Sequence, residues 1–227
     1  MSTALIVGLI CGGAGALYGA IAMGAGIYGL RFLSVLGFVL DVSWSLINSV
    51  GGLVWMLVCA IAGAGWIDPN DDSQRSGTAV YRNNPRGGNY DKTTIGPIIA
   101  GGWCSHEEVH VWQARILGPA YFITYVLAWL FNLLFRLITG KLASISEEAY
   151  YRIPLEDWAY CAGTTSGGAI NWGMWFLWLF LTAVYVGLIV AIVLGIALKS
   201  LVVGIVGAAG LIVYSLIRAL APRPSHH

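Results

Sequence analysis

Charged side chains are scarce in this sequence. Asp, Glu, Lys and Arg make up 10% of its 227 residues, whereas apolar residues make up 58%. In a typical soluble domain about a quarter of the residues are charged, so the deficit argues against a soluble protein and indicates a membrane protein. The formal net charge is only +1, which excludes the basic surface that nucleic-acid binding requires. We therefore expect the lipid bilayer, and no nucleic acid, as a partner.

Paired cysteines are also absent. The four Cys residues are dispersed and form no CxxC pair, which excludes a zinc ribbon and a thioredoxin-type redox site. Cys11 and Cys59 lie in apolar segments, where a cysteine is most simply a small core residue. Cys104 and Cys161 flank two polar stretches, and a disulfide between them is possible only outside the cytosol.

Long apolar runs dominate the remaining sequence, at 3–28, 32–65, 120–139, 172–198 and 201–220. The first lacks the basic n-region of a secretory signal, so we interpret it as a retained membrane helix. The second exceeds the ~20 residues of one straight crossing, which favours an interfacial helix or a hairpin broken near Gly51-Gly52. The predicted fold is an all-α, polytopic transmembrane protein with about four to six membrane segments.

The composition divides the chain into five segments. Gly-rich transmembrane helices are expected at 1–66, because small residues let membrane helices approach closely. A polar extramembrane loop is expected at 67–96, where Asp, Asn, Gly and Pro are frequent. The segment at 97–170 holds the most polar motif, a crossing and a second polar stretch. A transmembrane hairpin at 171–221 and a tail at 222–227 complete the chain.

The stretch CSHEEVHVWQ (104–113) contains an HExxH motif. We expect a helix over 98–117, near the membrane interface, starting after Gly96-Pro97 because Pro suits the first helical turn. His106 and His110 then lie on the same helical face and can bind one metal ion, with Glu107 placed as a general base. The alternative is a polar interfacial stretch whose histidines are satisfied by water and hydrogen bonds.

A zinc site needs a third protein ligand. The other two histidines are the terminal pair, so a carboxylate is the natural choice, and the downstream candidates are Glu147, Glu148, Glu156 and Asp157. Glu156 has an alternative role, because a carboxylate just after Pro154 is favoured by the helix dipole. Two imidazoles and one carboxylate also accept iron or manganese, so zinc is the leading metal and another divalent ion is possible.

Several neighbouring polar residues also have two interpretations. Gln113 lies one turn beyond His110 and can orient that ligand, or it can make a plain helix–helix hydrogen bond. Glu108 and Asp157 are expected to face water or Arg115. Asp41, within an apolar run, can mark a functional pathway, although a helix-end position near the interface accounts for it equally well.

The stretches HEEVHVWQARILGPAYFITYVLAW and YYRIPLEDWAY resemble a family of uncharacterised bacterial membrane proteins with a zincin-like motif. The matching positions are His106, Glu107, His110, Gln113, Gly118, Pro119, Tyr121, Tyr125, Tyr151, Pro154, Glu156 and Ala159. The resemblance covers about 96–163. Trp158 and Tyr160 depart from it, because they are bulkier than the residues expected on either side of Glu156 in that family. The resemblance implies a metal site with Glu156 as the third ligand and a location in a bacterial inner membrane, without naming a substrate.

Two functional classes follow. The first is a membrane-embedded zinc metallopeptidase or related hydrolase, with His106, His110 and Glu156 as ligands and Glu107 as general base. The second is a non-catalytic accessory subunit of a membrane complex, with other membrane subunits or further copies of the chain as partners. A transporter is disfavoured, because no internal repeat is evident and charge within the apolar runs is scant.

Overall fold

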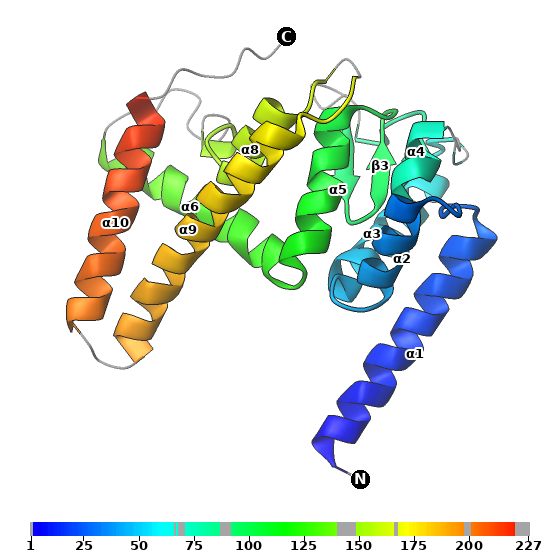
Figure 1. Cartoon of the computed structure of the whole chain (residues 1–227), viewed down its shortest axis with the longest axis horizontal. Helices are drawn as coiled ribbons and strands as arrows, with labels where there is room; N and C mark the ends of the chain where they lie inside the picture. The colour runs from blue at the N-terminus through cyan, green and yellow to red at the C-terminus, as the bar shows by residue number, and fades with distance from the viewer. Residues whose placement is uncertain are drawn as a thin grey trace. The chain divides into compact units, whose positions relative to one another are not determined.

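The computed structural model describes residues 2–65, 67, 71–86, 92–139, 149–165, 168–197 and 201–220. The chain divides into two compact units. Unit 1 comprises Met1–Ile123 and Gly163–Ile170, and unit 2 comprises Thr124–Ala162 and Asn171–His227. Both units are mainly helical, as the composition predicted (Figure 1).

Unit 1 contains helices α1 (Thr3–Gly24), α2 (Phe32–Val42), α3 (Leu46–Ile61), α4 (Asp71–Ser76) and α5 (Ser105–Leu117). Helix α1 begins at an N-cap, Ser2, whose hydroxyl accepts a hydrogen bond from the backbone N–H of Leu5 at 3.4 Å. Helix α5 is the element that carries the HExxH motif. It packs against α2 and against the small sheet of this unit.

That sheet has three short strands in the order β1-β3-β2: β1 (Ala79–Tyr81), β2 (Thr93–Ile95) and β3 (Ile98–Ala100). Strand β3 pairs in parallel with β1 and antiparallel with β2. Gly96-Pro97 forms the tight turn of the β2–β3 hairpin, with Gly96 at a φ of 55°, a conformation that suits glycine.

The all-α prediction therefore holds for most of the described residues but omits this small sheet. Helix α5 begins at Ser105 rather than directly after Pro97, and the expected loop contains α4, β1 and β2 among its described residues. The physical reason is tertiary: Ile98–Ala100 is buried between two partner strands. Three-residue strands leave too short a pattern for sequence periodicity to detect.

Unit 2 contains α8 (Pro154–Ala162), α9 (Trp172–Ala197), α10 (Leu201–Leu220) and most of α6 (Ala120–Ile138), whose first turn belongs to unit 1. Helices α9 and α10 form a hairpin (Figure 1). Their backbones meet closely at Gly195, where an added Cβ would lie 2.4 Å from the backbone nitrogen of Gly204. Helix α8 packs on α9, with the Trp158 and Trp175 ring centroids 5.1 Å apart.

Three helices are long and apolar enough to cross a membrane: Thr3–Gly24, Ala120–Ile138 and Trp172–Ile192. Helices α2 and α3 pass the same test only as a pair, and they are bent by 97° at their junction. The described residues thus supply three candidate spans, or four if the bent pair counts as one. Three is below the predicted range of four to six, and four is its lower end.

The break in the second apolar run lies at 43–45 and not near Gly51-Gly52. Ser45 at the break donates a side-chain hydrogen bond to the carbonyl of Ala114 at 3.0 Å. Gly52, by contrast, continues the helix, and an added Cβ there would lie 3.0 Å from the Ile95 carbonyl oxygen. The glycines allow close packing of an intact helix, whereas the polar residues stabilise its interruption.

Candidate metal centre

Helix α5 is buried around its whole circumference from Ser105 to Arg115. His106 is 4% exposed and His110 is 6% exposed. A helix that is half polar in sequence and buried on every side has to satisfy its polar groups within the protein. Such an environment does not fit a water-exposed interfacial stretch.

The two histidines face each other across one helical turn. Their Nε2 atoms are 3.3 Å apart, and their rings are nearly perpendicular, with an interplanar angle of 85°. Two nitrogens that bind one tetrahedral zinc at about 2.0–2.1 Å lie roughly 3.3–3.4 Å apart. The pair therefore fits the separation that two ligands of a single zinc ion require.

Gln113 orients the second imidazole. Its Oε1 lies 2.8 Å from His110 Nδ1. An amide oxygen can only accept, so Nδ1 carries the proton and the Nε2 lone pair is directed toward His106. The tautomer of His110 is thereby the one that can bind a metal through Nε2.

Glu107 lies on the same turn as His106 and is 8% exposed. The hydroxyl of Thr94, in the middle of β2, donates a hydrogen bond to Glu107 Oε2 at 2.6 Å. A charged acceptor makes this a strong bond that restricts the rotation of the carboxylate. Thr94 was not among the sequence candidates, because its contact depends on the unpredicted strand.

Glu156 lies in the first turn of α8 and is 1% exposed. The phenol of Tyr125, on α6, donates a hydrogen bond to Glu156 Oε1 at 2.5 Å. His106, His110 and Glu156 form a group of buried side chains that each offer one ligand atom, and these three atoms all lie within 4.8 Å of one another. Such a group could hold a metal ion.

The other sequence candidates fall in different places. Glu147 and Glu148 lie outside the described residues. Glu108 and Asp157 are 8% and 5% exposed, so the first of the two environments expected for them, water, is wrong. Cys104 and Cys161 are free thiols and not the disulfide considered from sequence. Burial raises the pKa of the Cys104 thiol, which disfavours the thiolate.

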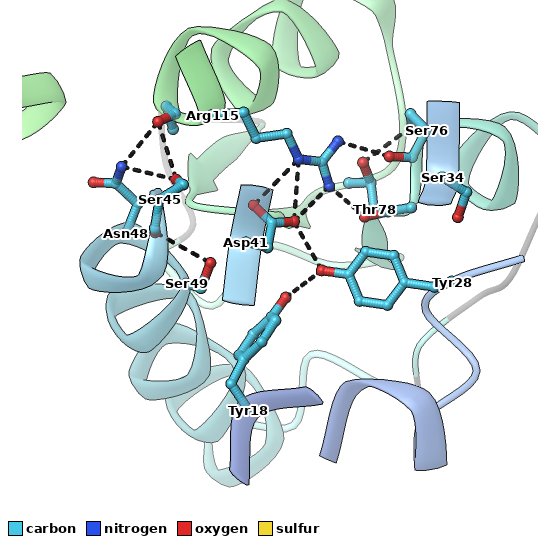
Figure 2. A network of polar contacts seen from close by, with 12 residues as sticks. Tyr18, Tyr28, Ser34, Asp41, Ser45, Asn48, Ser49, Ser76, Thr78 and Arg115 are labelled. Carbon is cyan, nitrogen blue, oxygen red and sulfur yellow. Dashed lines mark hydrogen bonds and ion pairs between the residues drawn. The ribbon is translucent and has the colours of Figure 1, made fainter. Parts of the chain in front are cut away.

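The partner of Arg115 is Asp41, a pairing that the sequence did not predict. The Arg115 guanidinium forms a buried ion pair with Asp41, with Nη2 2.7 Å from Oδ2 and both side chains 1% exposed (Figure 2). Arg115 also donates to the carbonyls of Ser76 and Gly77 at 2.6 and 2.7 Å. Burial alone would lower the pKa of Arg115, but the Asp41 carboxylate outweighs it and raises that pKa, so the side chain stays charged.

Two tyrosines extend this network (Figure 2). Tyr28 Oη donates to Asp41 Oδ2 at 2.8 Å, and Tyr18 Oη lies 2.5 Å from Tyr28 Oη. Because the Tyr28 proton is used on Asp41, Tyr18 is the donor of the second bond. The signal available in the sequence was the lone acid Asp41 in the apolar run 32–65 and the base Arg115 at the end of the HExxH helix. Such opposite charges pair when they are buried.

No protein-family model, curated protein or solved structure matches the chain. The resemblance to bacterial zincin-like membrane proteins therefore stays a prediction.

Proposed function

We propose that this chain is an integral membrane protein of a bacterial inner membrane that acts as a zinc metallopeptidase or related hydrolase. His106, His110 and Glu156 are the proposed ligands, and Glu107 is the proposed general base. The observation that carries the proposal is the 3.3 Å separation of the two buried imidazole nitrogens, together with the Glu156 carboxylate oxygen in the same group.

The cost of burial supports the proposal. Two imidazoles and a carboxylate removed from water are expensive unless they are paired or coordinate a metal. The donor set suits zinc, which binds two His and one Glu in known hydrolytic sites and keeps a further position open. Iron or manganese would fit the same donors.

The chain's own residues then have distinct roles. Bound zinc supplies a Lewis acid for carbonyl chemistry. Glu107 accepts the proton of the attacking water and returns it to the leaving group, while Thr94 holds one oxygen of that carboxylate at 2.6 Å. Gln113 holds the ring of His110 in the binding tautomer. The proposed reaction is the hydrolysis of a peptide bond. Hydrolysis of a lipid ester or amide would use the same groups.

An accessory subunit is the second candidate, and one observation favours it. The first half of α1 is exposed and apolar: Leu9 is 60% exposed and Ile10 is 65% exposed, and an added Cβ at Gly8 or Gly12 would meet nothing within 4 Å. Close packing of this half against a helix of another membrane subunit or a second copy would use these glycines. In that case the metal group would be structural.

Metal content decides between the proposals. Elemental mass spectrometry of detergent-purified protein should give one zinc per chain. His106→Ala and Glu156→Gln should lose it, whereas Asp157→Asn, next to the proposed ligand, should retain it. A wild type that contains no metal under conditions that do not strip it would contradict the site. Zinc lost in His106→Ala but retained in Glu156→Gln would remove Glu156 as a ligand.

Glu107→Gln separates an enzyme from a structural site. We expect zinc to stay bound and hydrolysis of a peptide library to be lost, with Glu108→Gln as the matched control. Full hydrolytic activity in Glu107→Gln would contradict the general-base role. The accessory subunit would be favoured by three results together. Glu107→Gln and Glu108→Gln would bind zinc equally, the wild type would hydrolyse no peptide, and a partner would co-purify stably.

A further inference from the structure

Helix α2 runs antiparallel along the second half of α1. An added Cβ at Gly19 would lie 3.3 Å from the Phe38 ring, and one at Gly15 would lie 2.6 Å from the Val42 carbonyl oxygen. The contact thus moves toward the N-terminus of α1 as α2 proceeds toward its own C-terminus. The chain leaves α1 at Gly24, turns, and returns along the same helix as far as the level of Gly15.

This register gives the depth of the break between α2 and α3. Helix α1 has 22 residues, which at about 1.5 Å per residue matches a hydrocarbon core of about 30 Å. Gly15 lies nine residues before Gly24, or about 13 Å along the axis. The end of α2, at Val42, therefore reaches approximately the middle of the membrane that α1 crosses.

Helix α3 then returns to the level at which α2 began. Cys59, near its C-terminal end, belongs to one core cluster with Ala22 near the end of α1, and the same cluster extends to Val42 and Leu46 at the break. A cavity at the same level is lined by Ala25 together with Met56, Ala60 and Gly63. Both ends of the bent pair are thus close to the C-terminal end of α1, and only the break is close to its middle.

One side of the break packs against protein: Ser45 is buried, whereas Ser43 and Trp44 are exposed. Trp44 Nε1 donates to the Ile116 carbonyl at 3.0 Å, and Asn48 Nδ2 donates to the carbonyls of Ala114 and Gly118 at 3.0 and 2.8 Å. These carbonyls lie at the C-terminal end of α5, where Ala114 and Gly118 also accept backbone hydrogen bonds from Gly118 and Tyr121.

Within the bend itself, the backbone N–H groups of Ser43 and Ser45 donate to the Leu40 carbonyl, and that of Leu46 donates to the Ser43 carbonyl. These bonds lower the cost of an irregular backbone at membrane depth.

We propose that Phe32–Ile61 does not cross the membrane but forms a re-entrant hairpin, with both ends on the side where α1 ends. Neither helix could cross alone, because 11 and 16 residues span only about 16 and 24 Å. A single bent crossing would place the two ends on opposite sides, contrary to the cavity that Ala25, directly after α1, lines together with Met56, Ala60 and Gly63.

The hairpin also determines on which side of the membrane the metal group lies. Its break holds the C-terminal end of α5, and His106 lies eleven residues before Leu117, or about 16 Å along the helix. Just before α5, Ala100 pairs with Tyr81, and Tyr81 lines the same cavity as Ala25. The N-terminal end of α5 is therefore near the membrane surface on the side where α1 ends, opposite the N-terminal end of α1. Substrate would reach the site from that side, a consequence that rests on the proposed function, whereas the hairpin itself does not.

Cysteine accessibility tests the hairpin. Single cysteines would be introduced at Ser2, Arg31 and Asn83, which are all exposed, and labelled with a membrane-impermeant maleimide in sealed vesicles of each orientation. The unsubstituted protein gives the background from the native cysteines. We expect Arg31→Cys and Asn83→Cys to label in the same orientation and Ser2→Cys in the opposite one. Labelling of Arg31→Cys and Asn83→Cys from opposite sides would overturn the hairpin.

The side of the metal is measured in the same vesicles. EDTA does not cross the bilayer, so it should remove zinc only in the orientation in which Asn83→Cys is labelled. Removal only in the other orientation would overturn the assigned side. Vesicles that contain no zinc would refute the proposed function, and the maleimide result would still decide on the hairpin.

Discussion

His110 depends on one neighbour for its orientation. Gln113 Oε1 accepts from Nδ1 at 2.8 Å, and without that acceptor the imidazole can rotate or take the other tautomer. Groups that hold a metal ligand in this way typically contribute 10- to 100-fold to metal affinity.

Gln113→Leu should therefore raise the zinc Kd about 10- to 100-fold, as measured by competition with a chromogenic chelator. Gln113→Glu keeps an oxygen acceptor for Nδ1–H and should stay within a few-fold of wild type. An unchanged Kd in Gln113→Leu would mean that Gln113 serves only helix packing.

Arg115 and Asp41 form the second residue-scale feature. Both side chains are 1% exposed, so either charge left alone would be buried without compensation. Arg115→Leu should lower the free energy of unfolding by about 3–5 kcal/mol, because it leaves the Asp41 carboxylate unpaired.

Thermal unfolding in detergent measures this effect. Arg115→Leu combined with Asp41→Asn should cost less than the sum of the two single changes, since the pair is coupled. Arg82→Leu, at an exposed arginine, is the control and should change stability by less than about 0.5 kcal/mol. Additive losses in the double variant would contradict the pairing.

At the scale of elements, the contact between α1 and α2 depends on glycine at defined positions. An added Cβ at Gly15 would lie 2.6 Å from the backbone oxygen of Val42, whereas one at Gly12, one turn earlier, would meet nothing within 4 Å. A side chain at Gly15 therefore has to push two helices apart, and its clash is with backbone that cannot rotate away.

Gly15→Val should destabilise the protein by about 1–3 kcal/mol, and Gly12→Val on the same helix should be close to neutral. Both can be compared by unfolding in mixed detergent micelles. A larger loss in Gly12→Val than in Gly15→Val would show that the exposed half of α1 is packed against a partner and would support the accessory-subunit alternative.

At the scale of the whole molecule, a metal that binds only the folded chain stabilises it by mass action. Free zinc at 100 times its Kd should add about 2.7 kcal/mol to the free energy of unfolding. We expect the thermal midpoint to rise with zinc and to fall with chelator. His106→Ala should lose this dependence, and an equal zinc-dependent shift in that variant would place the binding elsewhere.

Local patterns in the sequence account for part of the fold and of the candidate site. The apolar runs predict membrane-length helices because hydrophobicity is summed along contiguous residues, and α1, α6 and α9 satisfy that criterion. The spacing of His106 and His110 predicts a shared helical face because the helical repeat is a local property of the backbone. Zinc, the hydrolytic activity and the bacterial membrane stay predictions.

Residues that are distant along the chain decided the rest. Strand β3 exists because β1 and β2 lie on either side of it, so Pro97 ends a hairpin turn instead of starting α5. Asp41 finds Arg115 across 74 positions, and Glu156, alone among the acidic candidates within the described residues, groups with the two histidines. Hydrogen bonding and charge pairing at such separations depend on the path of the whole chain, which periodicity over one helical segment does not contain.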